Sequence, residues 1–143
     1  MAYYQDLSPY GYFTETIPPG IDAVSVGWLD PGHAYPAAEP APLFADRLFA
    51  LACEHLSTIT SRWHGCRLCP RRLFGGGRTY PVRVIRNGRE ILVGHGEIRV
   101  RTGLGQWLIA PDLIVHYVIA HHYAPPEPFV EAVLAGRVVA HTL

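Results

Sequence analysis

The sequence predicts an α+β protein with a small antiparallel sheet of about four to five strands, three helices and a zinc knuckle. Three observations predict this class. They are one amphipathic helical pattern, a hairpin signal between alternating segments, and three cysteines confined to residues 53–69. The 143 residues are 49% hydrophobic and 17% charged, which is typical of an ordered chain that buries a core. We therefore expect one zinc-stabilised domain over residues 1–143.

The N-terminal third predicts an arm, a strand and a helix. Residues 1–20 are rich in Tyr, Pro and Gly without any helical or strand period, so we expect an aromatic arm that covers the core. Residues 22–29 read as a strand. Residues 43–57 carry apolar side chains at the spacing of one helical face. Cys53 falls at the edge of that face, near the end of the helix, where its thiol can reach a following loop.

The middle of the chain predicts a meander of short antiparallel strands. Asn87 and Gly88 form the strongest hairpin signal, because a type I′ turn needs positive φ at both positions. The strands expected around and after this turn span residues 79–86, 89–93, 97–101 and 106–109. In the third of these, alternation places Ile98 and Val100 inward and puts Glu97 on the arginine side, in a surface ion pair.

Two helices are expected in the last third. Pro111 suits the first helical position and Asp112 the first turn, and the residues that follow, to 120, are apolar except for His116. A final helix is expected from about Pro126 to Gly136.

Cys53, His64, Cys66 and Cys69 are the predicted zinc ligands. Cys66 and Cys69 form a C-x-x-C pair, whose two thiolates can face one tetrahedral metal ion, and the other two residues complete a Cys3His set. Four protein ligands leave no open position, so this Zn2+ would be structural and no catalytic residue is assigned.

A rival set replaces two of these ligands with histidines from further along the chain. His116 and His121 would then join Cys66 and Cys69 in an arrangement like a treble clef. On a helix, these histidines are five residues apart and about 140° around the axis, whereas paired ligands prefer a spacing of four. This spacing makes the rival the less favoured set.

Charge and hydropathy limit the partners and the compartment. Residues 62–101 hold ten arginines and two acids, but the pI of about 7.1 is low for a nucleic-acid binder. No apolar run has the roughly 20 residues that span a bilayer, and no secretory signal is visible. We expect neither a nucleic-acid nor a membrane partner, and we expect a cytoplasmic location, where reduced thiols favour metal binding.

Three sequence blocks resemble those of a family of small, uncharacterised bacterial proteins. They are H-G-C-R-L-C at 64–69, G-E-I-R-V at 96–100 and H-Y-V-I-A-H-H-Y-A-P-P-E-P-F at 116–129, accompanied by G-W-L-D at 27–30. The resemblance implies a cysteine on the helix before the H-x-C-x-x-C block, which maps onto Cys53. It implies no activity.

Two functional hypotheses follow. The favoured one is a zinc-binding, non-enzymatic module with a structural metal that binds another protein. The alternative is a metal-dependent enzyme that uses His116, His121 and Glu97, residue types suited to hydrolytic or acid–base chemistry. An open coordination position on the metal would favour the enzyme.

Overall fold

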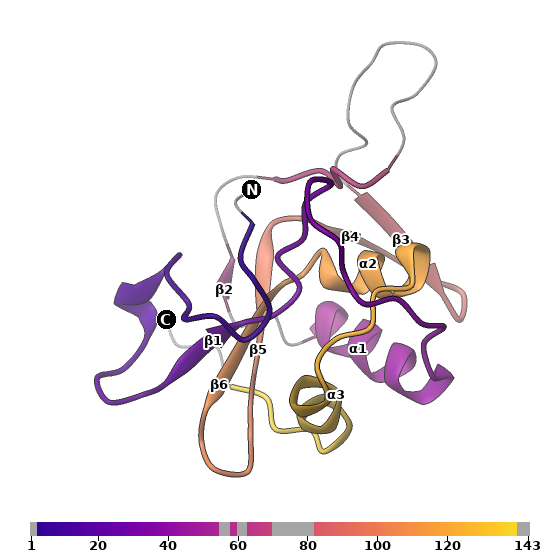
Figure 1. Ribbon diagram of the computed structural model, residues 1–143. Helices are drawn as coiled ribbons and strands as arrows, with labels where there is room; N and C mark the ends of the chain where they lie inside the picture. The colour runs from indigo at the N-terminus through magenta and orange to yellow at the C-terminus, as the bar shows by residue number, and fades with distance from the viewer. Residues whose placement is uncertain (1–2, 55–57, 60–62, 70–81, 140–143) are drawn as a thin grey trace.

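The computed structural model describes residues 3–54, 58–59, 63–69 and 82–139, and it has the predicted α+β class (Figure 1). The three predicted helices are present in this part of the chain. A single 3-10 turn, η1 (Thr14–Thr16), precedes them in the arm. The helices are α1 (Pro42–Glu54), α2 (Ile114–His121) and α3 (Glu127–Leu134). The strands are β1 (Ala23–Ser25), β2 (Thr58–Ile59), β3 (Val82–Arg86), β4 (Arg89–Val93), β5 (Gly96–Arg101) and β6 (Trp107–Pro111).

The strands form two sheets, and the larger one is mixed rather than purely antiparallel. Its order is β1-β6-β5-β2, in which β5 pairs antiparallel with both neighbours while β1 pairs parallel with β6. The antiparallel prediction therefore needs correction at β1. Parallel pairing requires a long connection between the two strands. Here that connection contains α1 and the four strands β2 to β5, so no tight turn constrains the direction of β1.

The hairpin of β3 and β4 forms a second sheet of its own. Its turn confirms the Asn-Gly signal, because Asn87 has φ 51° and Gly88 has φ 79°, and Arg86 pairs with Arg89 across the turn. Val82, Val84 and Val93 of this hairpin are buried in the same core as the three helices. The hairpin thus packs on the helices instead of extending the large sheet.

The two faces of the large sheet are covered by different parts of the chain. Ile98, Val100, Leu108 and Ala110 lie in the main core with the helices. Ile109, between Leu108 and Ala110 on β6, lies in a second, smaller core with Tyr10 and Trp28. Figure 1 shows the helices to one side of the sheet and much of the indigo N-terminal segment to the other.

The N-terminal arm is fixed by backbone pairing as well as by its rings. Tyr4 forms a β-bridge with Trp28, and Pro9 forms one with Val24. The Tyr4 and Trp28 rings meet edge to face at 5.4 Å. Burying the aromatic area offsets the entropy lost by ordering a segment whose described residues form no α-helix and no named strand.

Because the arm covers β5, the predicted surface ion pair is buried. Glu97 and Arg99 are 1% and 3% exposed, and an Arg99 guanidinium nitrogen lies 2.8 Å from Glu97 Oε1. The Tyr10 hydroxyl donates to Glu97 Oε2 at 2.6 Å, and Arg99 donates to Thr16 Oγ1 at 2.7 Å. Strand alternation was predicted correctly, but the segment that covers the polar face comes from the distant N-terminus.

Candidate metal centre

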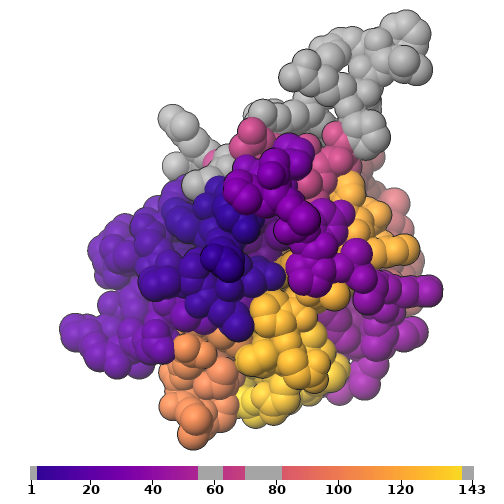
Figure 2. All heavy atoms as spheres, viewed as in Figure 1, coloured from indigo at the N-terminus to yellow at the C-terminus, as the bar shows by residue number. Residues whose placement is uncertain are grey.

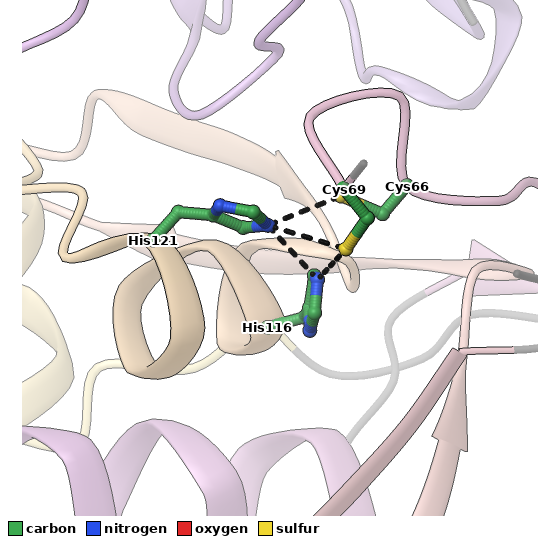
Figure 3. Close-up of side chains that lie close together, drawn as sticks. All are labelled: Cys66, Cys69, His116 and His121. Carbon is green, nitrogen blue, oxygen red and sulfur yellow. Dashed lines mark hydrogen bonds between the residues drawn. The ribbon is translucent and has the colours of Figure 1, made fainter. Parts of the chain in front are cut away.

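Four side chains from two distant segments converge on one point: Cys66, Cys69, His116 and His121. Their ligand atoms all lie within 4.8 Å of one another (Figure 3). The cysteines are on the loop that precedes the β3–β4 hairpin, and the histidines are on α2. Cys66 is buried and the other three are partly buried. This is the ligand set that the sequence analysis gave as the rival.

The separations are close to those of ligand atoms around one metal ion. Zinc bonds of about 2.0–2.1 Å to nitrogen and about 2.3 Å to sulfur place neighbouring ligand atoms about 3.3–3.8 Å apart. The two Nε2 atoms are 3.2 Å apart, and Cys69 Sγ lies 3.2 Å from His116 Nε2. His121 Nε2 lies 3.4 Å from each of the two sulfurs. The donor set and its spacing are therefore those of a cluster that could hold a metal ion.

Hydrogen bonding alone does not account for this cluster. His121 Nε2 lies within 3.4 Å of three other polar atoms, the two thiol sulfurs and His116 Nε2. A neutral imidazole nitrogen has either one N–H or one lone pair, so it can satisfy one partner in the ring plane. A cation at the centre would satisfy all four atoms at once.

The protonation states also suit a bound cation. Burial, helped by the neighbouring His121, lowers the pKa of His116 to about 4, so its ring is a neutral ligand at pH 7. Burial also lowers the pKa of His121. Burial raises the pKa of the Cys66 thiol to about 12, and the adjacent Cys69 adds to the shift. Binding of a metal at Cys66 must therefore displace a proton.

The end of α2 lets histidines five residues apart meet. His121 is the last helical residue, and His122 takes the left-handed conformation with φ 54° while its N–H bonds to the Tyr117 carbonyl. The His116 and His121 rings are almost perpendicular, at 80°, with centroids 4.9 Å apart. Each ring presents its far nitrogen, Nε2, and this reach offsets the angular mismatch that made the set less favoured.

The cysteine loop rests on the turn between β4 and β5. The His64 N–H donates to the Gly94 carbonyl at 2.6 Å. Gly94 has φ 121°, and a Cβ there would lie 2.2 Å from the His64 carbonyl oxygen, so glycine is required. The Trp63 ring lies 4.0 Å from the His95 ring.

Hydrogen bonds to Asp112 also hold this turn in place. Its carboxylate accepts the N–H groups of Gly94 at 2.9 Å and His95 at 3.3 Å, and its own N–H donates to the Gly96 carbonyl. Asp112 was expected in the first turn of a helix, but it follows β6 and precedes α2, and it is 1% exposed. Burial raises its pKa to about 6, against the opposing effect of these hydrogen bonds.

Cys53 and His64, the other two predicted ligands, lie outside the cluster. Cys53 is on the last turn of α1 and packs against the main core as a small apolar side chain. His64 is held by its backbone to Gly94, which directs the loop so that Cys66 and Cys69 face α2. The signal that could have favoured the observed set is the pair of histidines on one short helix, following a C-x-x-C and a hairpin.

Glu97, proposed for the alternative enzyme, also lies outside the cluster. Tyr10 and Arg99 occupy its two carboxylate oxygens. His95 lies near Asp112 instead, with Nδ1 3.5 Å from a carboxylate oxygen. The structure therefore separates Glu97, which lies in a buried ion pair, from His116 and His121, which lie in the cluster.

Comparison with known proteins identifies a family of unknown function, but it does not test the sequence blocks or a bacterial origin. Neither a curated protein nor a solved structure matches the chain. None of the helices in the described ranges has the length and apolar character needed to cross a membrane. A family profile described as a domain of unknown function, DUF7919, matches residues 2–134. Because this match covers nearly the whole sequence, the chain belongs to that family.

Proposed function

We propose that this protein binds one structural zinc ion through Cys66, Cys69, His116 and His121, and that it acts as a module that binds another protein. The observation that carries the metal assignment is the convergence of two thiol sulfurs and two imidazole nitrogens within 4.8 Å. Two thiolates and two imidazoles form one of the usual structural zinc sets. Softer or harder ions suit this mixed set less well.

A structural role follows from the number of ligands. Four protein ligands complete the tetrahedral shell of zinc, so no position remains for a water molecule or a substrate. The site joins a loop to a helix that is 47 residues further along the chain, counted from Cys69 to His116. A metal ion at this point stabilises the folded chain, because the unfolded chain has no preformed site.

The alternative, a metal-dependent enzyme, has less support. It requires Glu97 beside the two histidines, but Glu97 is outside the cluster and bonded to Arg99 and Tyr10. A protein-binding role is consistent with a closed metal site. A compartment that keeps thiols reduced, such as the bacterial cytoplasm, suits a thiolate site of this kind.

Metal analysis of matched variants tests the assignment. Protein purified under reducing conditions without chelator should contain about one zinc per chain, as expected for one four-ligand site. Cys69→Ser and His121→Ala should lose the metal, whereas Cys53→Ser and His64→Ala should retain it. Zinc retained in His121→Ala and lost in Cys53→Ser would reject this ligand set.

A further inference from the structure

A cavity of about 260 Å³ lies between the N-terminal arm and the segment that leads to α1. Tyr3, Tyr4 and Asp6 line it on the arm, and Leu29, Tyr35 and Pro36 line it on the other segment. Figure 2 shows these two parts of the chain, in indigo and in purple, adjoining on one face of the molecule. The volume is suited to a side chain or a small molecule rather than to a larger ligand.

Both walls of the cavity are fixed by hydrogen bonds. Asp6 accepts the Gly27 N–H through Oδ1 at 2.9 Å and the Tyr123 hydroxyl through Oδ2 at 2.7 Å. Tyr4 is bonded to Trp28 through its backbone. The site is therefore held in place before any ligand arrives, which lowers the entropy cost of binding.

The second wall is tied to the metal centre. The Tyr35 hydroxyl donates to the carbonyl of His121, a proposed zinc ligand, at 3.2 Å. The neighbouring Pro36 carbonyl accepts the Ala124 N–H, and Ala38 N–H bonds to the His122 carbonyl. The cavity wall thus follows the end of α2, where the proposed metal would fix the chain.

The chemistry of the lining favours a cation. Asp6 is the one charged residue among the described residues that line the cavity, and it is accompanied by three tyrosines. Each carboxylate oxygen has a second lone pair beyond the bond it already accepts. Aromatic rings attract cations through their faces. The surrounding sequence adds to the field, because residues 1–61 contain seven acids and one arginine.

We infer that this tyrosine-lined cavity binds the guanidinium or ammonium head of a basic side chain on a partner protein. The inference deepens the proposed protein-binding role and rests on it for the source of the ligand. Arg or Lys on the partner would place its charge near Asp6 and its methylene stem against the tyrosine rings.

The test uses two capped amino acids of nearly equal shape. N-acetyl-arginine methylamide carries the guanidinium charge, and N-acetyl-citrulline methylamide replaces it with a neutral urea. In an NMR titration at low ionic strength, the arginine compound should bind at least about tenfold more tightly, because a hydrogen bond to a charged group is the stronger one. The amide shifts should be confined to the two walls. Equal affinity for both compounds, or shifts elsewhere, would overturn the inference.

Two pairs of variants separate binding from folding. Asp6→Asn should lower the affinity for the arginine compound to that for the citrulline compound. Asp22→Asn removes the same charge outside the cavity and should have no such effect. Tyr3→Ala should weaken binding by about 3- to 30-fold, the range of a cation–aromatic contact. Tyr12→Ala, at a tyrosine outside this cavity, is its control. Equal losses in a variant and its control would also overturn the inference.

The source of the cation and the metal centre are tested on the same samples. An alanine pentapeptide with a central arginine should bind at least as tightly as the capped amino acid. Weaker binding of the peptide would contradict the inference that the ligand belongs to a polypeptide. Zinc content is measured throughout. If zinc-loaded protein does not bind the arginine compound, the inference about the cavity is wrong and the metal proposal stands. If the purified protein contains no metal but binds the arginine compound, only the metal proposal is wrong.

Discussion

Two polar clusters attach distant segments of this chain, and they differ in what supplies the charge. The metal cluster, Cys66, Cys69, His116 and His121, brings a loop and α2 together around a point that could hold a metal ion. The arm cluster joins Tyr10 and Thr16 to Glu97 and Arg99, and it contains its own opposite charges.

The two clusters therefore differ in the conditions under which each can form. The arm cluster is complete once the chain has folded, because every charge has a partner of opposite sign within the protein. Under the proposed function, the metal cluster is completed only by an external ion and by loss of thiol protons. Stability should therefore respond to metal at one cluster and not at the other, and the following predictions test this contrast.

The largest effect is expected from removal of the metal. Cys69→Ser should lower the free energy of unfolding by about 4 kcal/mol or more, because it removes a metal and leaves a partly formed site. Thermal unfolding with and without a chelator measures this, and the chelator should destabilise the parent but not the variant. Cys53→Ser, the matched control, should behave like the parent. A variant as stable as the zinc-loaded parent would contradict the structural role.

The next effect concerns the turn that supports the cysteine loop. Gly94→Ala should destabilise the protein by about 2–4 kcal/mol, because the new Cβ meets the His64 carbonyl and the backbone conformation is unfavourable for alanine. Gly103→Ala is the control, since nothing lies within 4 Å of a Cβ there. Chemical denaturation of both variants measures the difference. Equal stability of the two would show that the loop does not rest on Gly94.

The stability of the protein should depend on pH through Asp112, which is hydrogen-bonded to the same turn. Its pKa of about 6 in the folded protein exceeds the unfolded value of about 3.9. Between these two values the folded state binds more protons, so the contribution of Asp112 to stability falls as pH rises from about 4 to about 6.

Comparison with Asp112→Asn isolates this effect from titration of the metal ligands. The stability of the parent relative to the variant should decline across that window by about 1–3 kcal/mol. Denaturation curves at several pH values measure the decline. A difference that is constant, or that grows with pH, would contradict the raised pKa.

The smallest effect is expected at the arm cluster. Tyr10→Phe removes the hydroxyl that donates to Glu97 and accepts the Phe13 N–H, and it should cost about 1–2 kcal/mol. The chelator response should stay that of the parent, because this cluster uses no metal. Tyr12→Phe, at an exposed ring, is the control and should change stability by less than about 0.5 kcal/mol. An altered zinc content in Tyr10→Phe would show that the two clusters are coupled.

Local sequence patterns determined much of the fold. The Asn87–Gly88 turn, the α1 helix and the inward positions of Ile98 and Val100 follow from turn conformation and hydrophobic period, which act over a few residues. The C-x-x-C pair likewise indicated a metal site, because its two ligands are near each other in any compact loop.

Tertiary structure alone decided the features that join distant segments. The direction of β1 depends on the long connection before β6, and the burial of Glu97 depends on the arm that covers β5. That His116 and His121, and not Cys53 and His64, lie beside Cys66 and Cys69 depends on where α2 ends and on how Gly94 directs the cysteine loop. These outcomes are set by packing between segments tens of residues apart, and periodicity within one segment carries no information about them.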